Sequence, residues 1–287
     1  MSRTIALVTL YNPDESVVSN VRAISRQVDK VYLCDNSKTN NSTLFCTIDN
    51  STYITVYRNL GISGAFNFVL KNYCFNWKND DFIIFFDQDS RIGENHIKNL
   101  EREFFLLQNK GVKIGCIGPV YYNRSSGKIE IPHKKKRLTE HTFSVTSIIT
   151  SSMLTTYERI ERIGFFNEEI FLDYADWDLC WRLIKDRKKC CVTDAAILDH
   201  AVGNGDKQVA SIRIRMYPQQ REYYQVRDGL YLIKKKYTPC KDKIMFIKRI
   251  TIDAFVHCLL LGGHKERAGY IMKGYKDYRH NITGELN

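Results

Sequence analysis

Two carboxylates one residue apart, Asp87 and Asp89, follow directly on an apolar run at residues 82–86. The run has the length and the β-favouring residues of a buried strand, and alternation along a strand would point both carboxylates to the same side. Open α/β sheets bind ligands at the carboxyl ends of their strands. Oxygen ligands at this position suit a hard divalent cation that substrate phosphates also hold, so the pattern predicts a Mg²⁺ or Mn²⁺ site. The alternative is a polar turn that ends the strand.

A second acidic group, Asp173, Asp176 and Asp178, lies within six residues at the expected start of a helix over 176–185. Acidic residues in a first helical turn complement the helix dipole, which is the structural interpretation of the group. Trp177 in the same segment would either stack on a bound ligand or pack in the core.

Arginine, tyrosine and histidine side chains in the second half of the chain are further candidates for ligand or metal binding. Arg221, Tyr224 and Arg227 are spaced by three residues, so they share one face of a helix. Guanidinium groups suit phosphate oxygens, and a solvated helix face is the alternative. His200 follows an expected strand at 192–198; an isolated histidine is more often structural than a metal ligand.

The first half of the chain alternates strands and helices, which predicts a mostly parallel sheet with helices on both faces. The second half mixes shorter strands with helices and becomes helical from about residue 219. We therefore expect an α/β domain over 1–218, in two parts (1–118 and 119–218), and a C-terminal helical region over 219–287. The expected strands are 4–10, 30–34, 53–57, 82–86, 114–117, 127–131, 143–149 and 192–198, and the expected helices are 16–27, 63–73, 95–109, 156–163 and 176–185.

Composition narrows the class of protein. The 287 residues are 44% hydrophobic and 26% charged, which is typical of a folded protein, and we expect neither a membrane-spanning segment nor a signal peptide. Nine cysteines without a paired motif indicate a reducing cytosol. The net charge of +11 favours an anionic membrane surface over nucleic acid, because no nucleic-acid-binding motif accompanies it. Residues 244–260 form an amphipathic helix that either packs on the domain or lies on a membrane.

Eight segments, in this order, resemble the family 2 glycosyltransferases, most closely their rhamnosyltransferase branch. The similarity covers residues 4–236 and continues more weakly to about 284. It implies a GT-A fold (a Rossmann-like, mostly parallel central sheet flanked by helices), a nucleotide-sugar donor and a divalent metal. The segments are TLYNP (9–13), CDNS (34–37), NLGISGAFN (59–67), FFDQDS (85–90), IGFF (163–166), FLDYADWDLCWR (171–182), DH (199–200) and REYYQVRD (221–228).

The resemblance assigns the nucleotide site to the first half. Asp35 would accept the imide N–H of thymine or uracil, although the segment around it also fits a polar turn. Gly61 permits close backbone approach, and Ser63 would cap a helix whose N-terminus favours anions. The remaining donor-site residues in this half are Thr9, Tyr11 and Asn12 at the base and ribose, and Asn59 and Asn67 along the nucleotide and sugar.

For the chemistry, the resemblance places the metal on Asp89 and His200, with Asp87 on the ribose or on metal-bound water. Asp176 takes the general-base position. Ala175 stands where the family more often has a glutamate, and Asp173 would replace that acid. The implied substrate contacts of the second half are Asp173, Trp177, Arg221, Tyr224 and Arg227.

The expected function is an inverting transfer of L-rhamnose from dTDP-L-rhamnose to a lipid-linked or oligosaccharide acceptor in bacterial cell-surface polysaccharide synthesis. The enzyme would be cytoplasmic and peripheral on the inner face of the plasma membrane, and homo-oligomerisation is left open. One alternative is a transferase that uses UDP-galactofuranose, UDP-glucose or UDP-N-acetylglucosamine. The other is a non-catalytic module that binds nucleotide sugars.

Overall fold

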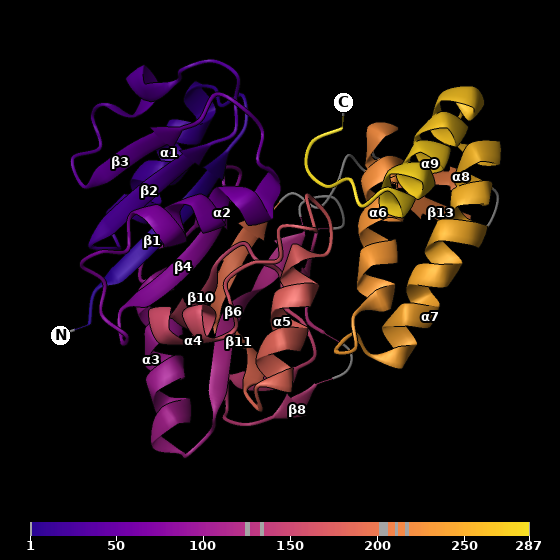
Figure 1. Ribbon diagram of the computed structural model, residues 1–287. Coiled ribbons are helices and arrows are strands. Elements are labelled where there is room, and N and C mark those ends of the chain that lie inside the picture. The colour runs from indigo at the N-terminus through magenta and orange to yellow at the C-terminus, as the bar shows by residue number, and fades with distance from the viewer. Residues whose placement is uncertain are drawn as a thin grey trace.

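A computed structural model describes residues 2–123, 127–132, 135–200, 206–209, 212–215 and 218–286, without the side chains of residues 123, 200, 206–209 and 212–215. It contains a mixed, mostly parallel sheet with helices on both faces, beside which the C-terminal helices stand as a separate group (Figure 1). The predicted fold class is confirmed. Within the described residues, no helix combines the length and the apolar character that crossing a bilayer requires.

The sheet has the strand order β3-β2-β1-β4-β10-β6-β11-β9-β8, with β5 paired to β11 and β7 paired to β6. Strands β1, β2, β3 and β4 run parallel, as do β6 and β11, so the carboxyl ends of β1, β2 and β4 meet at one edge. The strands are β1 (Thr4–Leu10), β2 (Lys30–Asp35), β3 (Ser51–Thr55), β4 (Phe82–Asp87), β5 (Arg91–Ile92), β6 (Ile114–Asn123), β7 (Lys128–Glu130), β8 (Lys136–Arg137), β9 (Thr142–Val145), β10 (Met153–Thr156) and β11 (Lys189–His200), with a separate hairpin of β12 (Asp206–Val209) and β13 (Ile212–Arg215).

Strand alternation supplies two apolar cores. Ile83 and Phe85 of β4 face the core under α2, α4 and α5, whereas Ile84 and Phe86 face the core under α1 and α3. The helices are α1 (Glu15–Ser25), η1 (Ser42–Phe45), α2 (Gly61–Asn72), α3 (His96–Asn109), α4 (Tyr157–Arg162), α5 (Ala175–Lys185), α6 (Gln220–Lys234), α7 (Cys240–Lys248), the π-helical η2 (Arg249–Asp253), α8 (Ala254–Leu260) and α9 (His264–Arg279).

The structure differs from the sequence-based expectation at several elements. Strand β10 was not predicted, although it occupies the centre of the sheet, antiparallel to β4 and β6. All four of its residues are buried, so the sequence lacks the apolar–polar alternation by which a half-buried strand is recognised. Helix α2 begins at Gly61 rather than Ser63. At α1, Asp14 caps the helix by accepting from the backbone N–H of Ser16.

The two halves of the α/β domain meet in a tight backbone contact. The carbonyl of Phe171 accepts from the backbone N–H of Ile62 at 2.9 Å. Gly61 lies against the same carbonyl with a φ of +69°, and a Cβ at this position would stand 2.2 Å from that oxygen. The predicted close approach at Gly61 is therefore present, and its partner is the protein's own backbone.

We expect Gly61→Ala to lower the free energy of unfolding by about 3 kcal/mol, because alanine disfavours the positive φ and its Cβ overlaps the Phe171 carbonyl. Denaturant unfolding would measure the loss. Gly93→Ala is the matched control, since a Cβ there meets no atom within 4 Å, and it should change stability by no more than about 0.5 kcal/mol. Equal effects of the two substitutions would contradict this account of the contact.

Candidate active site

A cleft of about 640 Å³ opens where β1, β2 and β4 end. Its walls come from the segments that follow these strands, the start of α2, the loop before α5, the start of α6 and the C-terminal tail. It is the edge at which parallel sheets bind ligands. The lining residues are Thr9, Leu10, Tyr11, Asn36, Asn59, Gly61, Ile62, Asp87, Gln88, Phe171, Leu172, Pro218, Gln220, Arg221, Tyr224, Glu285 and Leu286.

The floor of the cleft is built by β1 and β4. Thr9 and Asp87 are register partners, and the hydroxyl of Thr9 lies 3.5 Å from a carboxylate oxygen of Asp87. Gln88 accepts from the Tyr11 backbone N–H at 2.8 Å and donates to the Tyr11 carbonyl at 3.2 Å. These two hydrogen bonds between Gln88 and Tyr11 fix the loop after β1 to the end of β4. The sequence analysis assigned no role to Gln88, although it stands between the two candidate acids.

Asp35 lies at the end of β2, and its carboxylate forms hydrogen bonds with neighbouring protein groups. Its carboxylate accepts from Ser37 through both the backbone N–H and the hydroxyl, and from Asn41 and Tyr53 through their side chains. It is 2% exposed, so a nucleobase would have to displace one of these donors. The next residue, Asn36, lines the cleft instead and bonds to the backbone of Leu60 and Gly61.

The glycine-containing segment divides into residues that face the cleft and residues that support it. Asn59 lines the cleft and accepts from the Gly61 backbone N–H at 2.9 Å. Ser63 does not cap α2, because it lies inside the helix, 1% exposed, and its hydroxyl has no hydrogen-bond partner among the described residues. Asn12 is exposed at a φ of 45° and does not belong to the described cleft lining.

Asn67 is a structural clamp in this structure. It is 2% exposed, and its amide bonds to the backbone N–H and carbonyl of Phe166 and to the side chain of Glu168. It thus ties α2 to the loop before α5 across the chain. The expected contact of Asn67 with the nucleotide and donor sugar stays a prediction, and it would compete with these bonds within the protein.

The wall opposite β4 is the loop before α5, which α6 holds in place. Asp228 of α6 accepts from the Phe171 backbone N–H at 2.9 Å, and the rings of Phe171 and Tyr224 stack with centroids 4.7 Å apart. Arg221 binds Asp173 through Nε and Nη2 at 2.5–3.0 Å. Of the predicted residues on α6, Arg221 and Tyr224 therefore reach the cleft.

Arg227 does not share the exposed face that its spacing predicted. It is fully buried, and its guanidinium bonds to Asp228, to the hydroxyl of Tyr223 and to the carbonyl of Gly284. The C-terminal tail therefore folds back over α6 and is held there by Arg227. This contact explains how Glu285 and Leu286 come to line the cleft, which no sequence signal indicated.

Asp176 stands in the first turn of α5, partly exposed, and accepts from the Trp177 backbone N–H at 2.8 Å. Burial raises the pKa of its carboxyl to about 7, and the nearby Cys180 and Asp173 add to the increase. A carboxylate with this pKa suits proton transfer near neutral pH. Trp177 packs with its ring centroid 6.1 Å from that of Phe246, so the core interpretation applies to this side chain.

The candidate metal ligands are only partly described. Strand β4 ends at Asp87, and Asp89 lies in the turn that follows, so strand alternation does not decide its direction. Both acids are partly exposed near the cleft, which fits a hard cation with oxygen ligands. The side chain of His200 lies outside the described residues. Neither Asp89 nor Asp176 belongs to the described cleft lining.

A group of thiols is distinct from these oxygen ligands. Among the described residues, Cys116, Cys180 and Cys190 form a group of potential metal ligands whose sulfur atoms lie within 4.8 Å of one another. Cys180 lies on α5, Cys116 and Cys190 lie on the strands beneath it, and all three are fully buried, as small core residues are.

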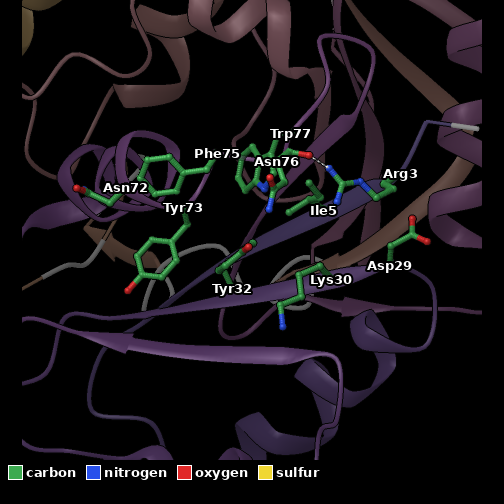
Figure 2. A pocket seen from close by; sticks show the side chains of 10 residues that line it. All are labelled: Arg3, Ile5, Asp29, Lys30, Tyr32, Asn72, Tyr73, Phe75, Asn76 and Trp77. Atoms are coloured by element: carbon green, nitrogen blue, oxygen red, sulfur yellow. Dashed lines mark hydrogen bonds between the residues drawn. The ribbon is translucent and has the colours of Figure 1, made fainter.

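A second cavity, of about 480 Å³, lies where β1 and β2 begin, away from the carboxyl ends of the strands (Figure 2). Of the two cations in its lining, Arg3 and Lys30, Arg3 is engaged by Asp81 and by the carbonyl of Asn76. Aromatic rings of Tyr32 and Trp77 form much of its wall. It brings together none of the predicted site residues, whereas the larger cleft brings together seven of them: Thr9, Tyr11, Asn59, Gly61, Asp87, Arg221 and Tyr224.

The chain is 28% identical over 288 residues to the dTDP-rhamnosyl transferase RfbF of Shigella flexneri, covering 95% of this chain and 93% of that protein. No family model matches the sequence. The relative confirms the predicted resemblance to a rhamnosyltransferase over nearly the whole chain.

Two solved structures share the fold. One is GalNAc-T7 with UDP, GalNAc and Mn²⁺, with a TM-score of 0.57 and 11% identity; the superposition covers 98% of this chain but only 56% of GalNAc-T7. The other is S. aureus TarS 1–349, with a TM-score of 0.54, 10% identity, and coverage of 98% of this chain and 83% of TarS. The chain is a glycosyltransferase with a GT-A fold.

The structural role of Asn67 can be tested separately from substrate binding. We expect Asn67→Ala to lower the free energy of unfolding by about 2–3 kcal/mol, since it leaves buried partners unsatisfied, and to leave the KM for donor unchanged. Asn72→Ala on the same helix is the control, because Asn72 is exposed and bonds only within α2 in the described contacts. A raised KM without a loss of stability would instead place Asn67 at the substrate.

Proposed function

We propose that this enzyme transfers L-rhamnose from dTDP-L-rhamnose to a hydroxyl of a lipid-linked or oligosaccharide acceptor in bacterial cell-surface polysaccharide synthesis, with inversion at the anomeric carbon. The observation that carries the proposal is the single cleft lined both by the predicted donor-site residues and by the loop that leads to Asp176. The full-length similarity to a dTDP-rhamnosyl transferase supports the choice of donor.

In this proposal, the cleft divides between donor and acceptor. The nucleotide lies over the ends of β1 and β2, beside Thr9, Tyr11 and Asn36, and the diphosphate lies toward Asp87. Arg221 contributes positive charge from the opposite wall, where Asp173 fixes its orientation. The acceptor enters between the loop before α5 and α6. Residues 1–118 thus serve the donor, residues 119–218 serve the acceptor, and residues 219–287 complete the wall.

Asp176 is the proposed general base. Its carboxylate takes the proton of the acceptor hydroxyl while that oxygen forms a bond to the anomeric carbon of rhamnose. The bond between the same carbon and the diphosphate oxygen breaks, and dTDP leaves with the electron pair. Because attack and departure occur on opposite faces of the sugar in one displacement, the configuration inverts.

A divalent cation is expected to assist the departure of dTDP. Asp89 and the histidine at position 200 would hold Mg²⁺ or Mn²⁺, with Asp87 on the ribose or on metal-bound water, and the bound ion would neutralise charge that develops on the diphosphate. Partly exposed carboxylates at the end of β4 support this assignment, as does the Mn²⁺ bound in the structure of GalNAc-T7.

A lipid-linked acceptor would place the enzyme in the cytoplasm, peripheral on the inner face of the plasma membrane. The net charge of +11 supports contact with an anionic membrane surface. The alternative partners of such a charge, nucleic acids, have no matching motif in the sequence.

The base assignment predicts both a loss of rate and a change in pH dependence. Asp176→Asn should lower kcat by about 10²- to 10⁴-fold. In the wild type, kcat/KM should rise with pH and level off above about 7, because the base acts only after its carboxyl loses its proton. The variant should lack this acid limb. Asp49→Asn, at an exposed acid in the loop before β3, should behave as the wild type. A wild-type rate for Asp176→Asn would contradict the assignment.

Turnover of nucleotide sugars tests donor and metal together. With Mn²⁺ present, dTDP-L-rhamnose should be hydrolysed or transferred at least about tenfold faster than UDP-galactofuranose, UDP-glucose or UDP-N-acetylglucosamine. EDTA should abolish turnover, and added Mn²⁺ or Mg²⁺ should restore it.

Faster turnover of a UDP-sugar would refute the donor assignment and favour the alternative transferase. Undiminished activity in EDTA would refute the metal role. Tight binding of dTDP without turnover of any donor would favour the non-catalytic module.

A further inference from the structure

The C-terminal region displays several large apolar side chains that the rest of the described chain leaves exposed. Helices α7, η2 and α8 follow one another without a break from residue 240 to 260. Phe246, Ile250 and Ala254 point inward and are buried. The exposed large apolar residues, which we call the apolar ridge, are Ile244 (68% exposed), Ile247 (49%), Ile252 (58%), Phe255 (64%) and Leu259 (58%).

The charge around the apolar ridge is strongly positive. Residues 234–280 contain twelve Lys and Arg against four Asp and Glu, which leaves eight of the chain's net eleven positive charges in this segment. Lys241 and Lys248, on the same helical run as the ridge, have side chains more than half exposed. An exposed apolar face bordered by cations is the pattern of a helix that lies in a membrane interface.

We propose that the apolar ridge docks this enzyme on an anionic lipid bilayer, with the large apolar side chains entering the interface and the surrounding cations contacting anionic headgroups. A second copy of the chain fits this surface less well. A symmetric dimer would bring two copies of the same strongly positive segment together, whereas anionic lipid complements it.

The docked region also contributes to the cleft. Helix α6 supplies Arg221 and Tyr224 to its wall, and the tail after α9 supplies Glu285 and Leu286. Helix α9 packs against both α6 and α8 (Figure 1). Docking through the ridge therefore fixes the height of the acceptor wall above the bilayer. This consequence for the acceptor rests on the proposed function, whereas the docking itself does not.

Co-sedimentation of the full chain with lipid vesicles tests the docking. The protein should bind vesicles that contain 30% phosphatidylglycerol far better than pure phosphatidylcholine vesicles, and binding should weaken as salt rises. The double variant Ile252→Ser/Phe255→Ser should bind the anionic vesicles at least about tenfold more weakly. Phe75→Ser is the matched control, because Phe75 is 84% exposed but lies at the second cavity in the α/β domain, and it should bind as the wild type.

Tryptophan fluorescence provides a second test of docking, in which the apolar side chains are not removed. The fluorescence of Phe255→Trp, compared with the unmodified protein, should shift to shorter wavelength on anionic vesicles, and that of Phe75→Trp should not. Vesicle binding that the ridge variants leave intact would overturn the proposal, as would a ridge-dependent dimer that binds no vesicles. Donor hydrolysis without vesicles separates the two proposals: docking without hydrolysis by the wild type would refute the transferase, and hydrolysis without docking would refute the ridge.

Discussion

The architecture of the cleft depends on the backbone of Phe171. Its carbonyl accepts from the N–H of Ile62 at the start of α2, and its own N–H donates to Asp228 of α6. One residue therefore joins the donor half, the loop before α5 and the C-terminal helices. Gly61 allows this contact, since any side chain would collide with the carbonyl. Without the contact, the wall that carries Leu172 and leads to Asp173 would have no fixed distance from the end of β4.

The contacts of Phe171 also help to position the acidic residues at the start of α5. Asp173 is held by Arg221, so the loop reaches α5 with a defined course. Asp176 directly follows Ala175 in the first turn of α5, and burial raises the pKa of its carboxyl to about 7. A carboxyl with this pKa is half ionised near neutral pH, so in the proposed mechanism it can both accept and release the acceptor's proton.

The sequence was sufficient for the features that depend on local pattern. The strands that end at Leu10, Asp35 and Asp87 could be located because they are apolar runs that end in polar residues, and their parallel order followed from the intervening helices. Asp89 could not be oriented, since the strand stops two residues earlier and turn geometry has no simple period.

Features that depend on distant partners escaped prediction. The partner of Asn67 lies 99 residues away, and Arg227 is buried by a tail that begins more than 50 residues later. Each residue has a polar side chain in a segment with functional resemblance, which made a substrate contact the natural expectation. The structure shows that both side chains also bond to distant segments of the protein, which no local pattern could indicate. The short central strand β10 was missed for a related reason, because its burial is decided by neighbours on both sides.

The most direct test of the central claim is a crystal structure of the enzyme with Mn²⁺ and a non-hydrolysable analogue of dTDP-L-rhamnose. The account predicts the nucleotide over the ends of β1 and β2, the cation on Asp89, and the Asp176 carboxylate on the side of the anomeric carbon opposite the diphosphate. A nucleotide bound elsewhere, such as in the cavity beside Trp77, or an Asp176 side chain directed away from the sugar, would contradict it.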